Sequence, residues 1–270
     1  MPTSYIQLPS FEPALRVLVV DDNELNQLVV CRALEDWNVE TTLADNGRQA
    51  VSIATAQPFD AILMDIQMPE MDGYEATRQL RGHARLRQLP IIGLTASASA
   101  QDQARALEAG MNATLPKPFD PVLLHASLLR FTSPGPPAPA ATTTASDFIS
   151  EQNRAIFPNW DLLEELAAGS ESFIAQIIST FLQQTPVLYQ QLLAASTAPD
   201  LPAQARLAHK LKGQVVYFGV PVIQQHLEKL ERPATSLNAA NSRYLVEIIG
   251  RQLTALYPHL EHRMRNSAAE

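Results

Sequence analysis

Two stretches of the chain carry side chains that can accept a phosphoryl group. His209 lies in the run Leu207–Gly219, which is typical of an amphipathic helix, and Asp65 closes a short apolar run that begins at Ala61. An imidazole nitrogen and a carboxylate oxygen are both nucleophiles that proteins use for covalent group transfer. The sequence therefore indicates phosphoryl chemistry at two positions that lie far apart in the chain.

The helical pattern around His209 predicts where its ring points. Residues three, four and seven apart share one face of an α-helix. Leu207, Leu211, Val215 and Phe218 therefore form one apolar stripe, which we expect to face a core. Because His209 is two positions from both Leu207 and Leu211, its side chain is predicted to point to solvent.

The neighbours of His209 suit a phosphoryl acceptor. Lys210 and Lys212 place positive charge close to the ring, where it would offset the charge of a bound phosphoryl group. Gly213 leaves space beside the ring, although glycine costs about 1 kcal/mol relative to alanine in a helix interior. A lone histidine on a helix is more often a solvated side chain, so this helix needs support from the rest of the sequence.

Residues 16–131 alternate between short apolar runs and helical patterns. This alternation predicts an α/β doubly wound domain with a central, five-stranded parallel sheet. We expect strands at 16–20, 39–44, 61–65, 90–95 and 113–116, and helices at 24–36, 46–56, 72–80, 100–109 and 120–131.

Polar residues follow the ends of four of these strands. Asp21 and Asp22 end the first, Asp65 the third, Thr95 the fourth and Lys117 the fifth. Ligands of such sheets bind at the carboxyl ends of the strands. Three clustered carboxylates repel one another unless a cation neutralises them, and a set of oxygen ligands favours Mg²⁺.

Each of these residues alone could be a helix cap, a turn residue or a solvated loop charge. Their recurrence at one strand end after another favours a common site. We therefore expect Asp21 and Asp22 to help hold Mg²⁺, and Asp65 to attack phosphorus. Thr95 and Lys117 are expected to bind phosphoryl oxygens, because charge stabilisation and positioning suffice for phosphoryl transfer.

Residues 16–131 resemble a response-regulator receiver domain. The resemblance rests on Asp21-Asp22, Met64-Asp65, Met68-Pro69, Met71-Asp72-Gly73, Leu94-Thr95-Ala96 and Lys117-Pro118-Phe119. It implies a flavodoxin-like sheet with Asp65 as the phosphoacceptor. It also implies that the backbone carbonyl of Gln67 is a metal ligand, that the small Ala96 leaves the carboxylate accessible, and that the Lys117–Pro118 bond is cis.

The string His209-Lys-Leu-Lys-Gly213, with Gly219 after it, resembles the signature of histidine-containing phosphotransfer (HPt) domains. Helical patterns follow Asn159, run from Ser170 to about 195, and cover 201–218, 220–231 and 236–264. Short connections between amphipathic helices favour an all-α four-helix bundle, here with an additional N-terminal helix. Pro186 predicts a kink or a break in the long helix.

The chain is accordingly divided into a lead-in (1–15), a receiver domain (16–131), a linker rich in Pro, Ala and Thr (132–146) and an HPt bundle (147–270). One position departs from the receiver pattern. Receivers often carry an aromatic residue three positions before the lysine, and this chain has Thr114 there. That departure fits a receiver that passes its phosphoryl group on better than one that drives an output through an aromatic switch.

Composition excludes several classes of protein. The chain has 270 residues, with 28 acidic and 20 basic side chains, and neither half is basic, so we expect no nucleic-acid partner. The single cysteine, Cys31, excludes an internal disulfide and a cysteine-based zinc site. No apolar run approaches the ~20 residues that span a bilayer, and no signal-peptide pattern is present, so we expect a cytoplasmic protein without a membrane segment.

The sequence predicts a two-component phosphorelay protein. Asp65 would take a phosphoryl group from a kinase phosphohistidine with Mg²⁺, and His209 would exchange it with a receiver aspartate, its own or another protein's. The expected partners are a sensor histidine kinase, other receiver domains, or both. The chain lacks room for an ATP-binding kinase domain, so we expect no phosphorylation from ATP, although a receiver can hydrolyse its own acyl phosphate.

Other interpretations of the sequence stay open. Phosphorylation of Asp65 could instead control binding, with the helical domain serving only as a scaffold. A hydrolase with an aspartate nucleophile is disfavoured, because such enzymes usually place a second Asp two residues later, where this chain has Gln67. The direction of transfer, its occurrence within or between chains, and membership of a larger hybrid kinase are also left open.

Overall fold

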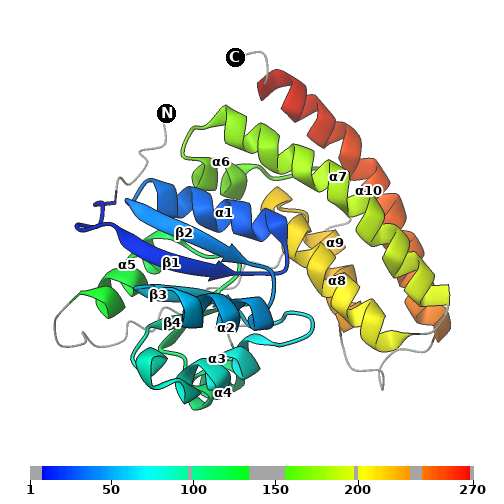
Figure 1. The fold of residues 1–270 in the computed structure, drawn as a ribbon. Coiled ribbons are helices and arrows are strands. Elements are labelled where there is room, and N and C mark those ends of the chain that lie inside the picture. Colours follow the sequence, from blue (N-terminus) through cyan, green and yellow to red (C-terminus); the bar gives the residue numbers. More distant parts are fainter. Residues whose placement is uncertain (1–7, 97–98, 134–155, 198–199, 232–238, 268–270) are drawn as a thin grey trace. The chain divides into compact units, whose positions relative to one another are not determined.

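The computed structural model describes residues 8–96, 99–133, 156–197, 200–231 and 239–267 (Figure 1). Contacts divide them into two compact units, one containing the described residues up to 133 and the other those from 156 onward. The predicted lead-in up to residue 7, the linker from residue 134 and residues 147–155 of the predicted bundle lie outside the described residues.

The first unit is a five-stranded sheet in the order β2-β1-β3-β4-β5, and every pair of neighbouring strands is parallel. This confirms the predicted α/β class. The strands are β1 (Leu15–Val20), β2 (Val39–Ala44), β3 (Ala61–Asp65), β4 (Ile91–Thr95) and β5 (Ala113–Pro116). The helices are α1 (Glu24–Glu35), α2 (Gly47–Ala56), α3 (Gly73–Gly82), α4 (Ala100–Ala109) and α5 (Pro121–Thr132), with a short 3₁₀ turn η1 (Ala84–Leu86).

Helices cover both faces of this sheet, so its inner strands are apolar on both sides (Figure 1). One face, with Leu18 of β1 and Ile62 and Met64 of β3, packs against α2, α3 and α4. The helices α1 and α5 lie against the other face. Every residue of β3 is buried, so the strand that ends in Asp65 is held in the centre of the domain by packing on both faces.

Side-chain caps set where the receiver-like helices begin. Each of the five has a polar residue just before it whose side chain accepts a hydrogen bond from a backbone N–H of the first turn. These residues are Asn23, Asn46, Asp72, Ser99 and Asp120. Such caps satisfy donors that a helix cannot satisfy internally. The helices therefore start within one residue of the predicted positions wherever the prediction named a start.

The second unit is helical. It contains α6 (Asp161–Ala167), α7 (Glu171–Thr197), α8 (Leu201–Val215), η2 (Val216–Phe218), α9 (Pro221–Glu231) and α10 (Ala239–Ser267). The helix α7 packs against α8 and α10, and α9 packs against the same two helices, so these four form a closed ring around one core. This arrangement is the expected four-helix bundle with α6 as an additional N-terminal helix.

Of the predicted kink or break at Pro186, the break is wrong, because α7 continues through this residue to Thr197, while the kink stays a prediction. Thr185 and Leu188, on either side of Pro186, are both buried, while Pro186 itself is exposed. The packed face of the helix is therefore continuous past the proline. Tertiary packing of that face outweighs the local preference, as it does for most helices in folded proteins.

The predicted apolar stripe of α8 is shifted. Leu211 and Val215 are buried as expected, but Leu207 is only half-buried and Ala208 is buried instead. The buried face of α8 therefore includes Gln204 and Ala208 in place of Leu207. The side-chain amide of Gln204 donates to the backbone carbonyl of Ala195. A polar side chain with a buried partner can occupy a core position, and hydrophobicity alone does not reveal this.

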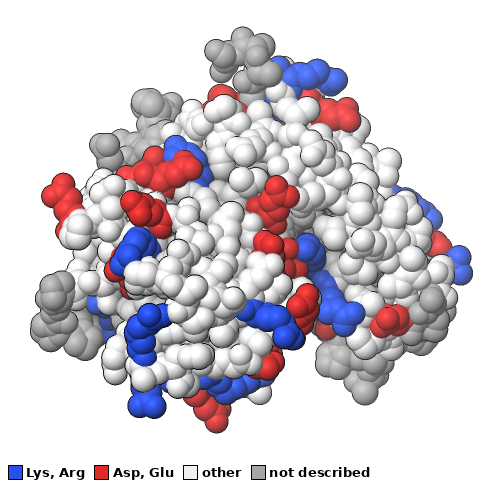
Figure 2. All heavy atoms as spheres, viewed as in Figure 1, with Lys and Arg blue, Asp and Glu red and all other residues white. Residues whose placement is uncertain are grey.

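The charges on the molecular surface are mixed in sign. On the face drawn in Figure 2, Lys and Arg side chains are scattered among Asp and Glu. None of the helices in the described ranges combines the length and the apolar character that crossing a bilayer requires.

Candidate functional site

The first candidate site lies at the carboxyl ends of β1 and β3. These strands are neighbours in the sheet but not in the chain, because the chain crosses from β2 to the other side of β1. Such a switch point brings the two strand ends together. Carboxylate oxygens of Asp21, Asp22 and Asp65 lie within 4.8 Å of one another. The structure thus gathers the three predicted acidic residues at one place.

Lys117 bridges two of these carboxylates. Its Nζ lies 2.6 Å from Oδ2 of Asp21 and 2.9 Å from Oδ2 of Asp65. Burial alone would lower the pKa of Lys117, but the attraction of Asp21 and Asp65 outweighs burial and raises its pKa above the ordinary value. The ammonium therefore stays charged and neutralises part of the acidic cluster.

Asp65 is less accessible than the sequence suggests. Its side chain is only 5% exposed, and Lys117 occupies one of its oxygens. Ala96, which directly follows β4, is exposed, as expected for a position that leaves an approach to the carboxylate. Little of the Asp65 carboxylate is therefore exposed, and the Lys117 ammonium lies beside it.

Asp21 is held by donors that the sequence did not single out. Its Oδ1 accepts from the backbone N–H of Asn23 at 2.9 Å, and the Asn26 amide donates to Oδ1 at 3.0 Å and to Oδ2 at 3.2 Å. Gln27 donates to the backbone carbonyl of Asp21 at 2.7 Å. The spacing of Asn26, five residues after Asp21 on the first turn of α1, is a local signal that could have identified it.

The remaining predicted residues also lie at this edge. Thr95 ends β4, and its backbone carbonyl accepts from the N–H of Lys117 at 2.6 Å. The Lys117–Pro118 bond is cis, as the family resemblance implied. The backbone N–H of Gln67 lies 3.3 Å from Oδ1 of Asp65, while the role of its carbonyl as a metal ligand stays a prediction.

Gly73 is required by the close approach of α3 to the end of β3. A Cβ on Gly73 would lie 2.3 Å from the backbone carbonyl oxygen of Asp65 and 2.9 Å from Cα of Ile66. Its own N–H donates to the carbonyl of Ile66 at 3.0 Å. Because the clash is with backbone, a side chain here would displace the segment that carries Asp65.

Gly73→Ala is therefore expected to destabilise the first unit by about 1–3 kcal/mol, the usual cost of overpacking, and to slow phosphorylation of Asp65. Urea unfolding and the rate of labelling by a small acyl phosphate would measure the two effects. Gly82→Ala in the same helix is the matched control, because nothing lies within 4 Å of its Cβ position. Equal stability of the two variants would contradict the close approach.

The second candidate site is on α8 of the bundle. The predicted solvent exposure of His209 is wrong in part, because its side chain is 20% exposed. Its Nδ1 lies 3.0 Å from Oε1 of Glu231, the last residue of α9, and Nζ of Lys212 lies 2.5 Å from Oε2 of the same carboxylate. Lys210 and Gly213, the other predicted neighbours, are half-buried.

Sequence reasoning missed Glu231. It lies 22 residues after His209 and on a different helix, so no helical spacing connects them. Burial would raise the pKa of Glu231, but hydrogen bonds from His209 and Lys212 and the charge of Lys212 lower it below its ordinary value. Glu231 is therefore a carboxylate at neutral pH.

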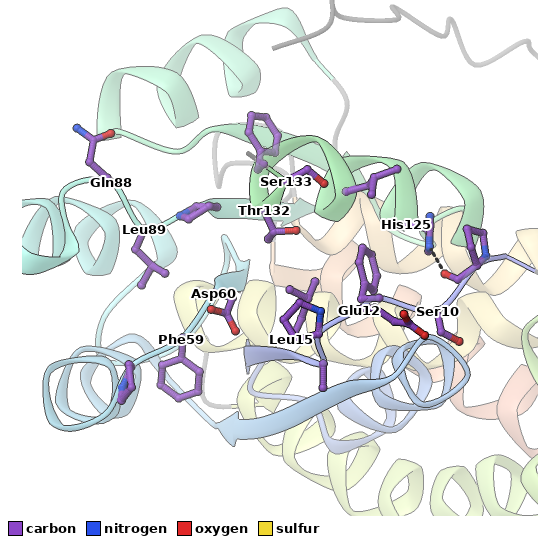
Figure 3. Close-up of a pocket in the computed structure, with 18 of the residues that line it drawn as sticks. Ser10, Glu12, Leu15, Phe59, Asp60, Gln88, Leu89, His125, Thr132 and Ser133 are labelled. Carbon is purple, nitrogen blue, oxygen red and sulfur yellow. Dashed lines mark hydrogen bonds between the residues drawn. The ribbon is translucent and has the colours of Figure 1, made fainter. Parts of the chain in front are cut away.

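A separate pocket of about 680 Å³ opens at the opposite, amino end of the sheet (Figure 3). Residues before β1, β3 and β4 line it together with the end of α5. Nε2 of His125, at its edge, donates a hydrogen bond to the carbonyl oxygen of Pro9 at 2.7 Å, and the ring stacks on Phe11. None of the predicted site residues lines this pocket.

Comparison with known proteins assigns a family to each unit. Residues 17–129 match the model of the response regulator receiver domain, and residues 176–263 match that of the Hpt domain. The chain is 33% identical over 224 residues to the signal transduction histidine-protein kinase BarA of Shigella flexneri, covering 83% of this chain and 24% of that protein. It is 31% identical over 226 residues to the sensor protein GacS of Pseudomonas syringae pv. syringae, covering 83% and 25%.

The chain thus spans about a quarter of the length of these curated relatives. Among solved structures, it is similar to the receiver domain of a sensor histidine kinase from Pseudomonas aeruginosa PAO1, whose crystal structure has a magnesium ion coordinated in the active-site cleft. The identity is 43%, the match covers 44% of this chain and 98% of that chain, and the TM-score is 0.42.

Proposed function

The chain is a two-component phosphorelay protein that joins a receiver domain to an HPt domain, and from this premise we propose that Asp65 and His209 are its two phosphoryl carriers. Asp65 takes the group from the phosphohistidine of a sensor kinase, and His209 exchanges it with a receiver aspartate. This module would lie in the cytoplasm, where ATP-dependent kinases load their histidines. The receiver domain would extend from residue 16 to 131, and the HPt domain from 147 to 270.

The observation that carries this proposal is the cluster of three carboxylates, two of which contact Lys117. Phosphoryl transfer requires positioning and neutralisation of negative charge rather than an elaborate base. Asp65 supplies the attacking oxygen, while the Lys117 ammonium lies 2.9 Å from that carboxylate, where it can meet the incoming phosphoryl oxygens. Thr95, at the end of the next strand, would donate to another of these oxygens.

The same residues fit a magnesium ion. Their donors are all oxygens, and Mg²⁺ favours one or two carboxylates together with phosphate oxygens and water. Asp21, Asp22, Asp65 and the backbone carbonyl of Gln67 would hold it. When bound, the ion would supply positive charge to the phosphoryl oxygens and reduce the repulsion among the carboxylates.

The test is to load the intact chain from acetyl phosphate labelled with ³²P and to separate the two kinds of label. An acyl phosphate is lost in alkali, whereas a phosphohistidine survives alkali and is lost in acid. We expect alkali-stable label in the wild type and none in His209→Gln, because the substitution removes the nucleophilic nitrogen.

His226→Gln is the matched control. His226 is a half-buried histidine on α9 whose Nδ1 lies 3.0 Å from Oε1 of Gln252, so it shares the setting of His209 without the acidic partner. This variant should label as the wild type does. Alkali-stable label that persists in His209→Gln would contradict the proposal, and full signalling by that variant would instead support a scaffold role for the HPt domain.

A further inference from the structure

Two buried glutamines connect α8 to the rest of the bundle, and the first of them is Gln204. Its side chain is only 2% exposed. Its amide nitrogen donates to the backbone carbonyl of Ala195 on α7 at 2.9 Å, and its carbonyl oxygen accepts from the hydroxyl of Ser242 on α10. Both ends of the Gln204 side chain therefore have partners, and these partners lie on two different helices.

Gln214, in the last turn of α8, makes the same kind of contact. Gln214 and Thr185 of α7 are both fully buried. The carbonyl oxygen of Gln214 accepts from the hydroxyl of Thr185 at 3.0 Å, and its amide nitrogen donates to the side chain of Gln184 at 2.8 Å. We call Gln204 and Gln214 the glutamine pins, because each is bonded across the core to a neighbouring helix.

The pins account for most of the polar groups in the core of the bundle. Of the five polar side chains that are buried in the described part of the bundle, four are the two pins and their hydroxyl partners. The fifth, Ser196, donates to a carbonyl of its own helix. Apolar contacts have no preferred direction, whereas a hydrogen bond weakens steeply when its geometry changes. The pins therefore fix the position of α8 more closely than its apolar contacts do.

His209 lies midway between the pins, five residues after the first and five residues before the second. Five residues turn an α-helix by about 500°, so each pin points about 140° away from the His209 side chain. The two pins lie about 15 Å apart along the helix axis. Hydrogen bonds at these two heights fix both the rotation of α8 about its axis and its position along that axis.

The rotation that the pins impose differs from the one that the apolar side chains favour. The buried face of α8 contains Gln204 and Ala208, while the larger Leu207 is only half-buried. A turn of α8 that brings Leu207 into the core carries His209 toward solvent, because these two residues lie about 160° apart. In the observed rotation, His209 is 20% exposed and its ring lies beside the end of α9.

We infer that Gln204 and Gln214 are positioning residues for phosphoryl transfer, which hold α8 in the rotation that keeps His209 beside α9 instead of the rotation that buries Leu207. This inference rests on the proposed function, in which His209 carries phosphoryl. In that transfer a ring nitrogen forms the N–P bond while the P–O bond to the receiver's aspartate breaks, and the aspartate leaves as a carboxylate. Because the nitrogen must meet phosphorus within a narrow range of positions, a turn of α8 slows transfer without unfolding the bundle.

The test replaces both pins and their hydroxyl partners by apolar residues in the intact chain. Exchanging both members of a buried hydrogen-bonded pair for apolar groups is nearly neutral for stability, so the urea midpoint of the bundle should be unchanged or higher. The carbonyl of Ala195 still accepts from a backbone N–H at 3.2 Å. The fourfold variant carries Gln204→Leu, Ser242→Ala, Gln214→Leu and Thr185→Val.

Two rates report on His209 in this variant. Its modification by diethyl pyrocarbonate, followed by mass spectrometry of the unphosphorylated protein, should become several-fold faster, because the released helix buries Leu207 and exposes the ring. Transfer from the acetyl-phosphate-loaded receiver to His209 should slow by roughly 10–100-fold. Adding Leu207→Ala removes the side chain whose burial favours the turn, and it should return both rates to near those of the wild type.

Two sets of variants support this comparison. Gln190→Leu is the matched control, because Gln190 is an exposed glutamine on α7, and it should leave both rates unchanged. Each pin is also replaced alone, together with its hydroxyl partner, which gives a second reading if the fourfold variant fails to fold. Each of these variants should change the two rates in the same directions as the fourfold variant.

The inference is overturned if removal of the pins leaves both rates as in the wild type. It is also overturned if Leu207→Ala does not restore them, because a general loss of structure is not repaired by removing another apolar side chain. Modification is measured before any phosphoryl group is added. A wild type without label on His209 would therefore refute the proposed function, while faster modification without the pins would still show that they set the rotation of α8. The two failures are thus distinguishable.

Discussion

Asp65→Asn is expected to abolish acid-stable, alkali-labile labelling of the receiver by acetyl phosphate, a loss on the order of 10³-fold or more. The amide of asparagine cannot replace the carboxylate as a nucleophile, while its shape is nearly the same. Lys117 keeps its contact with Asp21 at 2.6 Å, so the fold should survive. Phosphorylation assays and amide hydrogen exchange of the same sample would separate loss of chemistry from loss of structure.

Asp60→Asn is the control for this substitution. Asp60 directly precedes β3 and lies at its amino end, where it accepts from the backbone N–H of Arg16 at 2.8 Å. It is an aspartate next to the same strand but remote from the acidic cluster, and its loss should leave labelling intact. Alkali-labile label that remains on Asp65→Asn would show that another carboxylate is the acceptor.

The same variant determines how His209 is loaded. If His209 receives its phosphoryl group from Asp65, of the same chain or of another copy, the Asp65→Asn protein alone should also lose the alkali-stable label. Mixing Asp65→Asn with His209→Gln restores an intact donor on one chain and an intact acceptor on the other. Alkali-stable label in the mixture would demonstrate transfer between chains, whereas its absence would favour transfer within one chain.

Lys117→Met is expected to lower the free energy of unfolding of the receiver by about 3 kcal/mol in a chelator, and by less in millimolar Mg²⁺. Removing one partner of a buried ion pair leaves its charge uncompensated, which is strongly destabilising. Here two carboxylates, of Asp21 and Asp65, would lose the cation that bridges them. A divalent ion among the same oxygens would replace much of that charge.

Urea unfolding of the intact chain, followed by amide hydrogen exchange, would distinguish the receiver from the bundle. Arg48→Met is the control, because Arg48 and Glu70 form an exposed pair at 3.8 Å, and such pairs contribute about 0–1 kcal/mol. A Lys117→Met protein as stable as the wild type in chelator would contradict the role of Lys117. Stability that is independent of Mg²⁺ would argue against a metal at these oxygens.

The sheet could be predicted from the sequence because its signals are local. Apolar runs such as Ala61–Met64 indicate buried strands, and cap residues such as Asp72 mark where helices begin, within a few residues of the element they define. The continuation of α7 through Pro186 and the incomplete burial of Leu207 could not be predicted in the same way. Whether a proline ends a helix, or which residue of a turn is buried, depends on the neighbouring helices against which the segment packs.

The sequence by itself singled out Asp65 and His209 as the candidate phosphoryl carriers, because both lie in short motifs whose residue types and spacing are local features. Only the tertiary structure decided how accessible these two side chains are and what holds them. Asp65 is closed off by Lys117, 52 positions later, and His209 is held by Glu231 on another helix. Contacts between distant residues depend on the packing of whole elements, and a carboxylate at the end of α9 has no local feature that would connect it to an imidazole on α8.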